Sequence, residues 1–515
     1  MQSSITTYLI ILVVAALYIL AKYKLTYWKR RNIFHSPPDL VYGNLKSTII
    51  ENKTFSSTIL NIYTDAKQRG HKFFGIYKFW SPYFIPIDLD LIKCILQQNF
   101  DHFPNHYSFL NEANDPLSEN LFCLHDDKWK DMRSKLAPTF SSGKLKMMFP
   151  TVISCSKNMQ NILKERSEAN EPIDFKDLLA RFTTDVIGNV GFGVETNSLK
   201  DPASEFRQHG INVFQFNLRE KFLFFLIMVL PTWLIKKLGF SLNPPERTNF
   251  FTNLVEQTVR YREENNVYRK DFMHSLIQLK NFGKVHCLEE GSLVGKINQS
   301  DRTLSINQMA AHAFTFFLAG YETSATTMTF ALIELAQNQD IQDKVRSEIR
   351  KVLGKYNNEI TYESVTEMDY LEQVVLETLR KHPPIFLLPR VCSKDFHIPG
   401  TDVVLRAGTH VEIPVHAIHR DPEHYPEPDK FDPERFSPEN KAKRPRCAYL
   451  PFGEGPRICI GLRFGKMQSK IGLCTILNNY RITFNERTPL PVEYGPGIVS
   501  LAKGEIFMNL EPVPQ

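Results

Sequence analysis

Most of this chain carries apolar and polar residues in a helical pattern, and a few stretches depart from it. Ile5 to Ala21 is an almost unbroken apolar run without charge, at the short end of what spans a bilayer. Ser305 to Gln337 predicts one long helix, because it is rich in alanine, phenylalanine and methionine and contains no proline. Residues 73–87 are aromatic and β-branched with proline breaks and predict a short strand pair, and Leu89 to Gln98 predicts a helix. We expect a mainly α fold with a small β-sheet region near its N-terminal end.

The charge around the N-terminal run predicts its topology. Five basic residues follow the run at once: Lys22, Lys24, Lys29, Arg30 and Arg31. A cleaved signal peptide would carry its charge before the run, so the pattern favours an uncleaved transmembrane signal anchor, with a cleaved peptide as the alternative. Positive charge marks the cytosolic side. The glycosylation sequons at Asn52 and Asn298 should then never meet the lumen.

Composition limits the domain organisation. We predict an anchor at residues 1–21, a basic and proline-containing linker at 22–45, and a single domain at 46–515, since no later stretch resembles a linker. The chain is 43% hydrophobic with 38 phenylalanines and can bury a large core, whereas a formal charge of +6 is too weak to imply nucleic acid. The 8 cysteines lack paired spacing, which argues for a reducing compartment.

A second strongly apolar stretch, Phe222 to Ile235, is interrupted by Pro231 and is too short to span a membrane. It has two interpretations. It is either a core helix or an element that dips into a membrane, with Trp233 at the interface and Lys236 and Lys237 at the headgroups.

One cysteine stands in a glycine-rich loop ahead of a predicted helix. Gly453 and Gly455 allow an irregular backbone around Cys459, and Ile460 to Asn478 has helical composition. A thiol just ahead of a helix N-terminus is favoured as the thiolate. Taken alone, Cys459 is a buried small hydrophobe, a metal ligand or a nucleophile, and a zinc site lacks companion ligands nearby.

The long predicted helix contains a polar interruption from Ala319 to Ser324. Glycine there costs about 1 kcal/mol relative to alanine, and Thr323 can bond back to the carbonyl of Ala319 and loosen the helix. This Gly-x-Glu-Thr notch indicates either a function or a packing defect.

Two further pairs lie on helical faces. Trp129 and Arg133 are one turn apart, and Glu377 and Arg380 are three residues apart just before Pro383. Taken alone, the first pair is a core indole beside a solvated arginine, and the second is a surface salt bridge.

Together these motifs resemble the cytochrome P-450 monooxygenase family. The signature F-G-x-G-x-R-x-C-x-G runs from Phe452 to Gly461, and A-G-x-E-T, W-x-x-x-R, E-x-x-R and F-D-P-E-R-F occur in the family's order. The resemblance covers residues 22–515 and implies the P-450 fold, with 46–515 as a haem-binding monooxygenase domain and haem b as cofactor. It assigns the iron to Cys459, haem contacts to Trp129, Arg133, Arg390, Phe452 and Arg457, and oxygen activation to Ala319, Gly320, Glu322 and Thr323.

The resemblance also implies a setting for the haem. Glu377, Arg380 and Arg435 would form a buried three-way lock behind it, and the role of His102 stays open. Apolar side chains would hold the substrate: Phe109, Phe314, Phe317, Phe386, Ile498 and Val499.

Within the family, the runs at 140–151 and 451–468 are similar to the insect microsomal group that oxidises plant toxins and insecticides. The expected activity inserts one oxygen atom into a lipophilic substrate at the cytosolic face of the endoplasmic reticulum membrane. No G-x-G-x-x-G motif could bind NADPH, so NADPH-cytochrome P-450 reductase would supply electrons, with cytochrome b5 as a second candidate partner. Seven basic residues could form the docking face: Lys128, Lys130, Lys135, Lys441, Lys443, Arg444 and Arg446. A haem-thiolate isomerase and a haem-based carrier are the alternatives.

Overall fold

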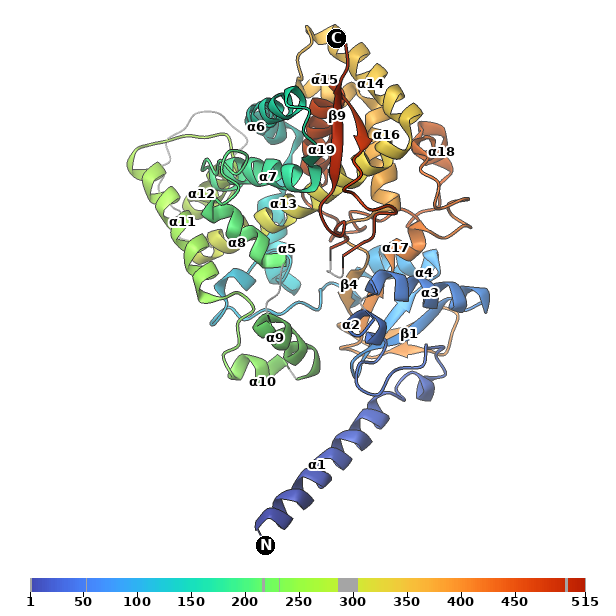
Figure 1. The fold of residues 1–515 in the computed structure, drawn as a ribbon. Helices are drawn as coiled ribbons and strands as arrows, with labels where there is room; N and C mark the ends of the chain where they lie inside the picture. The colour runs from blue at the N-terminus through green and yellow to red at the C-terminus, as the bar shows by residue number, and fades with distance from the viewer. Residues whose placement is uncertain are drawn as a thin grey trace.

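Helices dominate the structure, a computed structural model in which a few stretches of chain are not described (Figure 1). The described residues are 2–51, 53–214, 218–230, 232–285, 304–495 and 499–514. The helices are α1 (Gln2–Lys24), α2 (Lys46–Ile49), α3 (Phe55–Gln68), α4 (Leu89–Lys93), α5 (Asp126–Leu136), α6 (Ser142–Glu168), α7 (Phe175–Ile187), α8 (Glu205–Phe214), α9 (Leu218–Val229), α10 (Thr232–Lys237), α11 (Pro245–Glu264), α12 (Phe272–Phe282), α13 (Ile306–Gln337), α14 (Gln339–Leu353), α15 (Tyr362–Glu367), α16 (Asp369–Lys381), α17 (Val415–His419), α18 (Pro438–Lys443) and α19 (Leu462–Leu477). The strands are β1 (Phe73–Lys78), β2 (Ser81–Pro86), β3 (Ile173–Asp174), β4 (Leu388–Val391), β5 (Phe396–His397), β6 (Val404–Leu405), β7 (His410–Ile413), β8 (Tyr480–Phe484) and β9 (Phe507–Pro512).

Helix α13 forms the axis of the helical body. It begins where predicted, because the Ser305 hydroxyl accepts from the Gln308 amide and the Gln308 side chain accepts from the Ser305 amide, a complete capping box. Helices α7, α11, α16 and α19 pack along it, so most of its side chains are buried. The predicted long helix is confirmed, and it carries the polar notch into the centre of the molecule.

The sheets are small, as predicted. The largest has the order β1-β2-β7-β4, with β1 antiparallel to β2, β2 parallel to β7 and β4 antiparallel to β7. The predicted strand pair therefore forms, and strand β4 brings Arg390 into the interior opposite Val411. A three-stranded sheet with the order β3-β9-β8 and the pair β5-β6 complete the strands in the described part of the chain.

Residues 22–45, expected to be a linker, contact the large sheet. Trp28 is fully buried, and its indole Nε1 donates to the carbonyl oxygen of Ile76 at 3.0 Å. Its ring lies where a side chain on Gly75 would be, since a Cβ there would come within 2.4 Å of the indole. This glycine in β1 therefore provides the space that lets the segment dock.

Helix α1 projects from the body, and α9 and α10 lie at the same end of the molecule (Figure 1). The stretch Ile5–Arg31 is long and apolar enough to cross a membrane by length and composition. Pro231 lies outside the described residues, but the chain forms separate helices on either side of it. Phe222 and Trp233 are 59% and 66% exposed, whereas Leu223 and Ile235 are buried, so residues 222–235 are not a core helix throughout.

Candidate functional site

The cysteine loop has the backbone that its sequence predicts. The amide of Cys459 donates to the carbonyl oxygen of Phe452 at 2.9 Å, which closes the loop just ahead of α19. Gly455 has a φ of +76°, and a Cβ there would lie 2.0 Å from the Leu96 carbonyl oxygen, so only glycine fits. Gly461 is the N-cap of α19, and its amide hydrogen bonds to the Cys459 sulfur.

The Cys459 side chain has accessible surface but lies deep inside the protein. It is exposed, yet burial raises the pKa of its thiol, and the Gly461 amide and the positive charge of Arg133 lower that pKa only in part. Both observations agree if Cys459 faces an internal space and not bulk water. The expectation that the helix start alone favours the thiolate is wrong here, because desolvation outweighs it. A bound metal cation would reverse that balance.

The polar notch in α13 also faces accessible space. Ala319 is exposed and Thr323 half-exposed in a helix whose other side chains are mostly buried, and the two share one face because they are four residues apart. The Thr323 hydroxyl donates to the Ala319 carbonyl oxygen, as predicted. Helices α13 and α19 meet beside this face, where a Cβ on Gly465 would lie 3.8 Å from the Ser324 hydroxyl.

Gly320, which the resemblance assigns to oxygen activation, has a packing role. A Cβ at Gly320 would come within 2.6 Å of the Ile187 side chain on α7. The glycine therefore lets α7 approach α13 closely, and its cost in helix propensity is offset by that contact.

Glu322 points to a different face from Thr323. It is buried, and that burial raises the pKa of its carboxyl to about 7 while nearby Lys176, Tyr321 and Arg207 lower it. Residues at positions 322, 325, 326 and 329 share one helical face and line a small cavity against α7. An acid with this pKa can take up and release a proton near neutral pH.

Three arginines converge beside the cysteine loop, where the Asp126 carboxylate raises the pKa of Arg457 but lies too far away to form an ion pair with it. Arg133 Nη2 donates to the carbonyl oxygen of Ile458 at 2.8 Å, next to Cys459. Burial, together with the charges of Arg390 and Arg133, lowers the pKa of Arg457 to about 9. In the part of the chain that the structure describes, none of the three forms an ion pair. Such a cluster is stable only if a ligand supplies negative charge.

Arg457 holds the loop before α5. Its Nε donates to the Pro104 carbonyl oxygen and its Nη2 to that of Leu124, both at 2.8 Å. The guanidinium carbon also lies 4.1 Å from the centre of the buried Trp129 ring. Most of its donors are thus used by the protein, which leaves Arg133 and Arg390 as the arginines with more capacity for an anion.

Arg390 is buried with few partners. Its Nη1 donates to the Pro389 carbonyl oxygen at 2.7 Å, whereas its Nε has no partner among the described residues, and burial lowers the pKa of Arg390 to about 10. His106, which no sequence motif marks, is buried nearby with Nδ1 3.0 Å from the Phe122 carbonyl oxygen. Burial and the charges of Arg390 and Arg457 lower the pKa of His106 well below its usual range.

The three-way lock forms as predicted. Arg380 makes two hydrogen bonds to the fully buried Glu377, at 2.7 and 2.9 Å. Arg435 Nε lies 3.6 Å from the same carboxylate, and the Asp432 amide donates to it at 2.9 Å. Helix α16 is thereby joined to the segment that leads into the cysteine loop.

Two residues expected in the substrate pocket lie elsewhere. Phe314 and Phe317 occupy the face of α13 opposite Ala319, and both rings pack on Phe251 of α11. Their ring centroids lie 4.8 and 5.7 Å, respectively, from the centroid of the Phe251 ring. They are core residues, because α11 packs against this face, which the helix period turns away from the notch. Ile498, Cys287 and the sequon residues Asn52 and Asn298 lie outside the described residues.

The site residues fit a haem held through cysteine. Cys459 faces interior space, and the arginines beside it match a ligand that carries its own carboxylates, as haem b does with its propionates. Among the described residues no group of three or more His, Cys, Asp or Glu side chains comes together to hold a metal ion, so a zinc site has no support there.

Comparisons with known proteins agree with this site. The family model "Cytochrome P-450" matches residues 37–508. The chain is 42% identical to probable cytochrome P-450 6a23 of Drosophila melanogaster, with 98% of each chain covered. It is 40% identical to cytochrome P-450 6a2 of the same species, with 98% of this chain and 99% of the relative covered. It is also 40% identical to cytochrome P-450 6k1 of Blattella germanica, with 94% and 92% covered.

The fold and site define a haem-thiolate protein. The chain belongs to the cytochrome P-450 family, and it is a monooxygenase with a haem-thiolate cofactor.

Proposed function

We propose that this monooxygenase inserts one oxygen atom from O2 into lipophilic xenobiotics such as plant toxins or insecticides, with endogenous hormones or lipids as a second substrate class. The observation that carries the proposal is the Cys459 thiol, which is accessible yet enclosed by protein and stands where α19 meets α13. Haem bound there supplies the chemistry of oxygen activation and of electron transfer.

The chain's own residues would position the cofactor and move protons. Cys459 would bind the iron, with the Gly461 amide hydrogen bond tuning the donor strength of the sulfur. Arg133 and Arg390, with Trp129, would hold the propionates, and Arg457 would mainly keep the surrounding loop in place. Phe452, which is half-buried against the core, would cover the sulfur side. Glu322 and Thr323 would pass protons towards the site.

Apolar side chains near the cysteine loop suit a lipophilic substrate. Leu388 lies beside the loop, 3.8 Å from the position of a Cβ on Gly453. Ile385 is half-exposed and pairs with Val499 across an isolated β-bridge, and Phe109 and Phe386 remain candidate wall residues. Apolar walls with few polar groups favour binding by shape and hydrophobicity over a single defined ligand.

Electrons would come from NADPH through a separate reductase, or through cytochrome b5. The docking face is smaller than the sequence indicates, since four of its seven basic residues pair with local acids: Lys128, Lys130, Lys135 and Lys443. Lys441, Arg444 and Arg446 remain the candidates for contact with an acidic flavoprotein.

The enzyme would sit on the cytosolic face of the endoplasmic reticulum membrane, held by α1. The exposed aromatic rings on α9 and α10 support a second membrane contact at the same end of the molecule. Sugar on Asn52 or Asn298 in the native cell would contradict this orientation.

The test uses purified protein with reductase, NADPH and a panel of lipophilic compounds, read by mass spectrometry for the gain of one oxygen atom. Oxidation that requires both NADPH and reductase supports the proposal. Turnover of a peroxide without them would identify an isomerase, and binding without turnover of any compound would identify a carrier; either result contradicts the proposal.

A further inference from the structure

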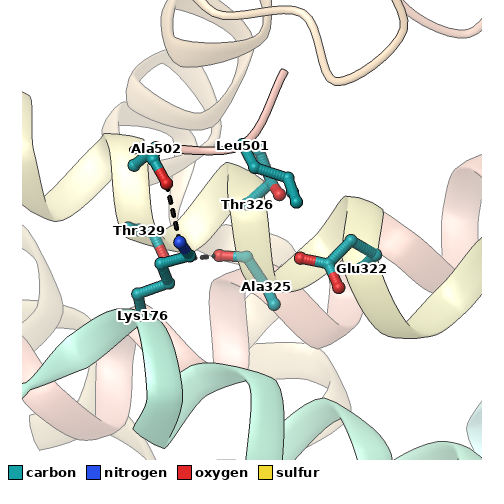
Figure 2. A pocket seen from close by; sticks show the side chains of 7 residues that line it. All are labelled: Lys176, Glu322, Ala325, Thr326, Thr329, Leu501 and Ala502. Carbon is teal, nitrogen blue, oxygen red and sulfur yellow. Dashed lines mark hydrogen bonds between the residues drawn. The ribbon is translucent and has the colours of Figure 1, made fainter. Parts of the chain in front are cut away.

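A small cavity with polar and apolar walls lies beside Glu322 on the α7 side of α13. Its walls are Glu322, Ala325, Thr326 and Thr329 of α13, Lys176 of α7, and Leu501 and Ala502 of the segment before β9 (Figure 2). It leaves about 10 Å³ of space for a water molecule, at the lower limit of what a single water needs.

Lys176 closes the outer wall of this cavity. Its ammonium donates to the carbonyl oxygens of Ala502 and Gly504, at 2.7 and 2.9 Å. An ammonium has three donors, so one remains for a water in the cavity. Figure 2 shows the Glu322 carboxylate reaching the same cavity from α13, and no direct ion pair joins it to Lys176 in the described structure.

The charge of Lys176 acts on Glu322 across this gap. Burial raises the pKa of Glu322 to about 7, and Lys176 is the foremost of the groups that oppose it, followed by Tyr321 and Arg207. Lys176 is itself half-buried, so its side chain connects the cavity to bulk solvent. Thr323, the next residue along α13, faces the interior space on the other side.

We propose that Lys176 is a positioning residue that holds a water molecule between solvent and Glu322, so that protons reach the oxygen-activating face of α13 through this cavity. Only O–H bonds form and break: bulk water supplies the proton, the cavity water passes it to a Glu322 carboxylate oxygen, and Glu322 releases it towards Thr323. This inference rests on the proposed proton-relay role of Glu322 and Thr323.

The experiment follows the ionisation of Glu322 in the haem-loaded enzyme by infrared spectroscopy of carboxyl groups, with the band assigned by its loss in Glu322→Gln. In Lys176→Met the titration of Glu322 should move upward by roughly one pH unit, and product formed per NADPH should fall several-fold as the solvent deuterium isotope effect increases. Lys176→Arg should restore the titration and the yield. Lys503→Met, which removes an exposed charge from the same C-terminal segment, is the control and should change neither.

Lys176 also ties the C-terminal segment to α7, so Thr326→Val provides a second variant that keeps those bonds. It removes a hydroxyl from the cavity wall and should lower the yield per NADPH in the same way. An unchanged Glu322 titration in Lys176→Met, or an unchanged yield in Thr326→Val, would overturn the proposal. The infrared titration requires no substrate, so failure of the proposed substrate class would leave the titration of Glu322 in Lys176→Met as an intact test.

Discussion

Arg133 and Ile458 join helix α5 to the cysteine loop: the guanidinium Nη2 donates to the carbonyl oxygen at 2.8 Å, one residue before Cys459. The bond holds the loop backbone and keeps a positive charge beside the sulfur, where it lowers the pKa of the Cys459 thiol. One side chain thus supports both the position and the charge state of the iron ligand.

Replacing Arg133 with alanine should weaken haem retention. The variant loses a charged hydrogen bond worth about 1.5–3 kcal/mol, so transfer of haem to an excess of apoglobin should accelerate roughly 10- to 100-fold. Arg463→Ala is the matched control, because Arg463 is exposed on α19 and donates to the Ser142 hydroxyl at 3.1 Å. Equal rates in the two variants would contradict the role of Arg133.

Replacing Cys459 with alanine should abolish activity together with the thiolate signature in the absorption spectrum of the reduced, carbon monoxide-bound protein. Cys447 and Cys474 are poor replacements as ligands, since burial raises the pKa of Cys447 to about 11 and that of Cys474 to about 12. Cys447→Ala, 12 positions earlier, is the control and should keep spectrum and turnover. A thiolate spectrum in Cys459→Ala would require a different ligand.

Replacing Glu377 with alanine should prevent stable haem incorporation. Arg380 is fully buried and would lose its carboxylate partner, and an uncompensated buried charge costs about 3–5 kcal/mol. The exposed pair of Glu439 and Lys443 gives the contrast, because Glu439→Ala should change stability by only about 0.3–0.5 kcal/mol. Haem content per chain and the thermal midpoint of unfolding are measured for both variants. Stoichiometric haem in Glu377→Ala would refute the role.

Sequence reasoning identified the elements whose signals are local. Helix α13 begins at its capping serine, and the cysteine loop closes as its glycines require, because Gly455 has a positive φ and a backbone carbonyl against it. Five short motifs also indicated the parts of the site, since each needs particular residue types at a fixed spacing. The lock at Glu377 could be predicted for the same reason, because its residues belong to two of these motifs.

The rest depends on contacts between distant segments. The helix period groups Phe314 with Phe317, but only the packing of α11 decides that this face is core. The sequence places Trp28 in a linker, because no local signal shows that Gly75 leaves room for its indole in the folded protein. Lys176 and His106 belong to no motif, and they acquire their neighbours only from the tertiary fold.

Without α1 the protein should still bind membranes. In a form lacking residues 2–20, the exposed rings of Phe222 and Trp233 would remain to enter the interface. At about 25 cal/mol per Å² of apolar surface, each ring contributes about 1–2 kcal/mol, so Phe222→Ser with Trp233→Ser should lower vesicle co-sedimentation at least tenfold. Tyr261→Ser, at a residue 60% exposed on α11, is the control. If the form lacking residues 2–20 binds vesicles equally well with and without the two serine substitutions, the second membrane contact is contradicted.

Glu322 should make the stability of the haem-loaded enzyme depend on pH. Its folded pKa of about 7 lies above the ordinary value for glutamate, so the folded state holds the proton more tightly than the unfolded chain. The stability from this group is fully present below about pH 4.3 and is lost as pH rises through 7, roughly 4 kcal/mol in all. Glu322→Gln stays neutral and lacks this loss, so its thermal midpoint should rise relative to the wild type between pH 5 and pH 8. A constant difference between the two midpoints across that range would show that Glu322 is already ionised at pH 5.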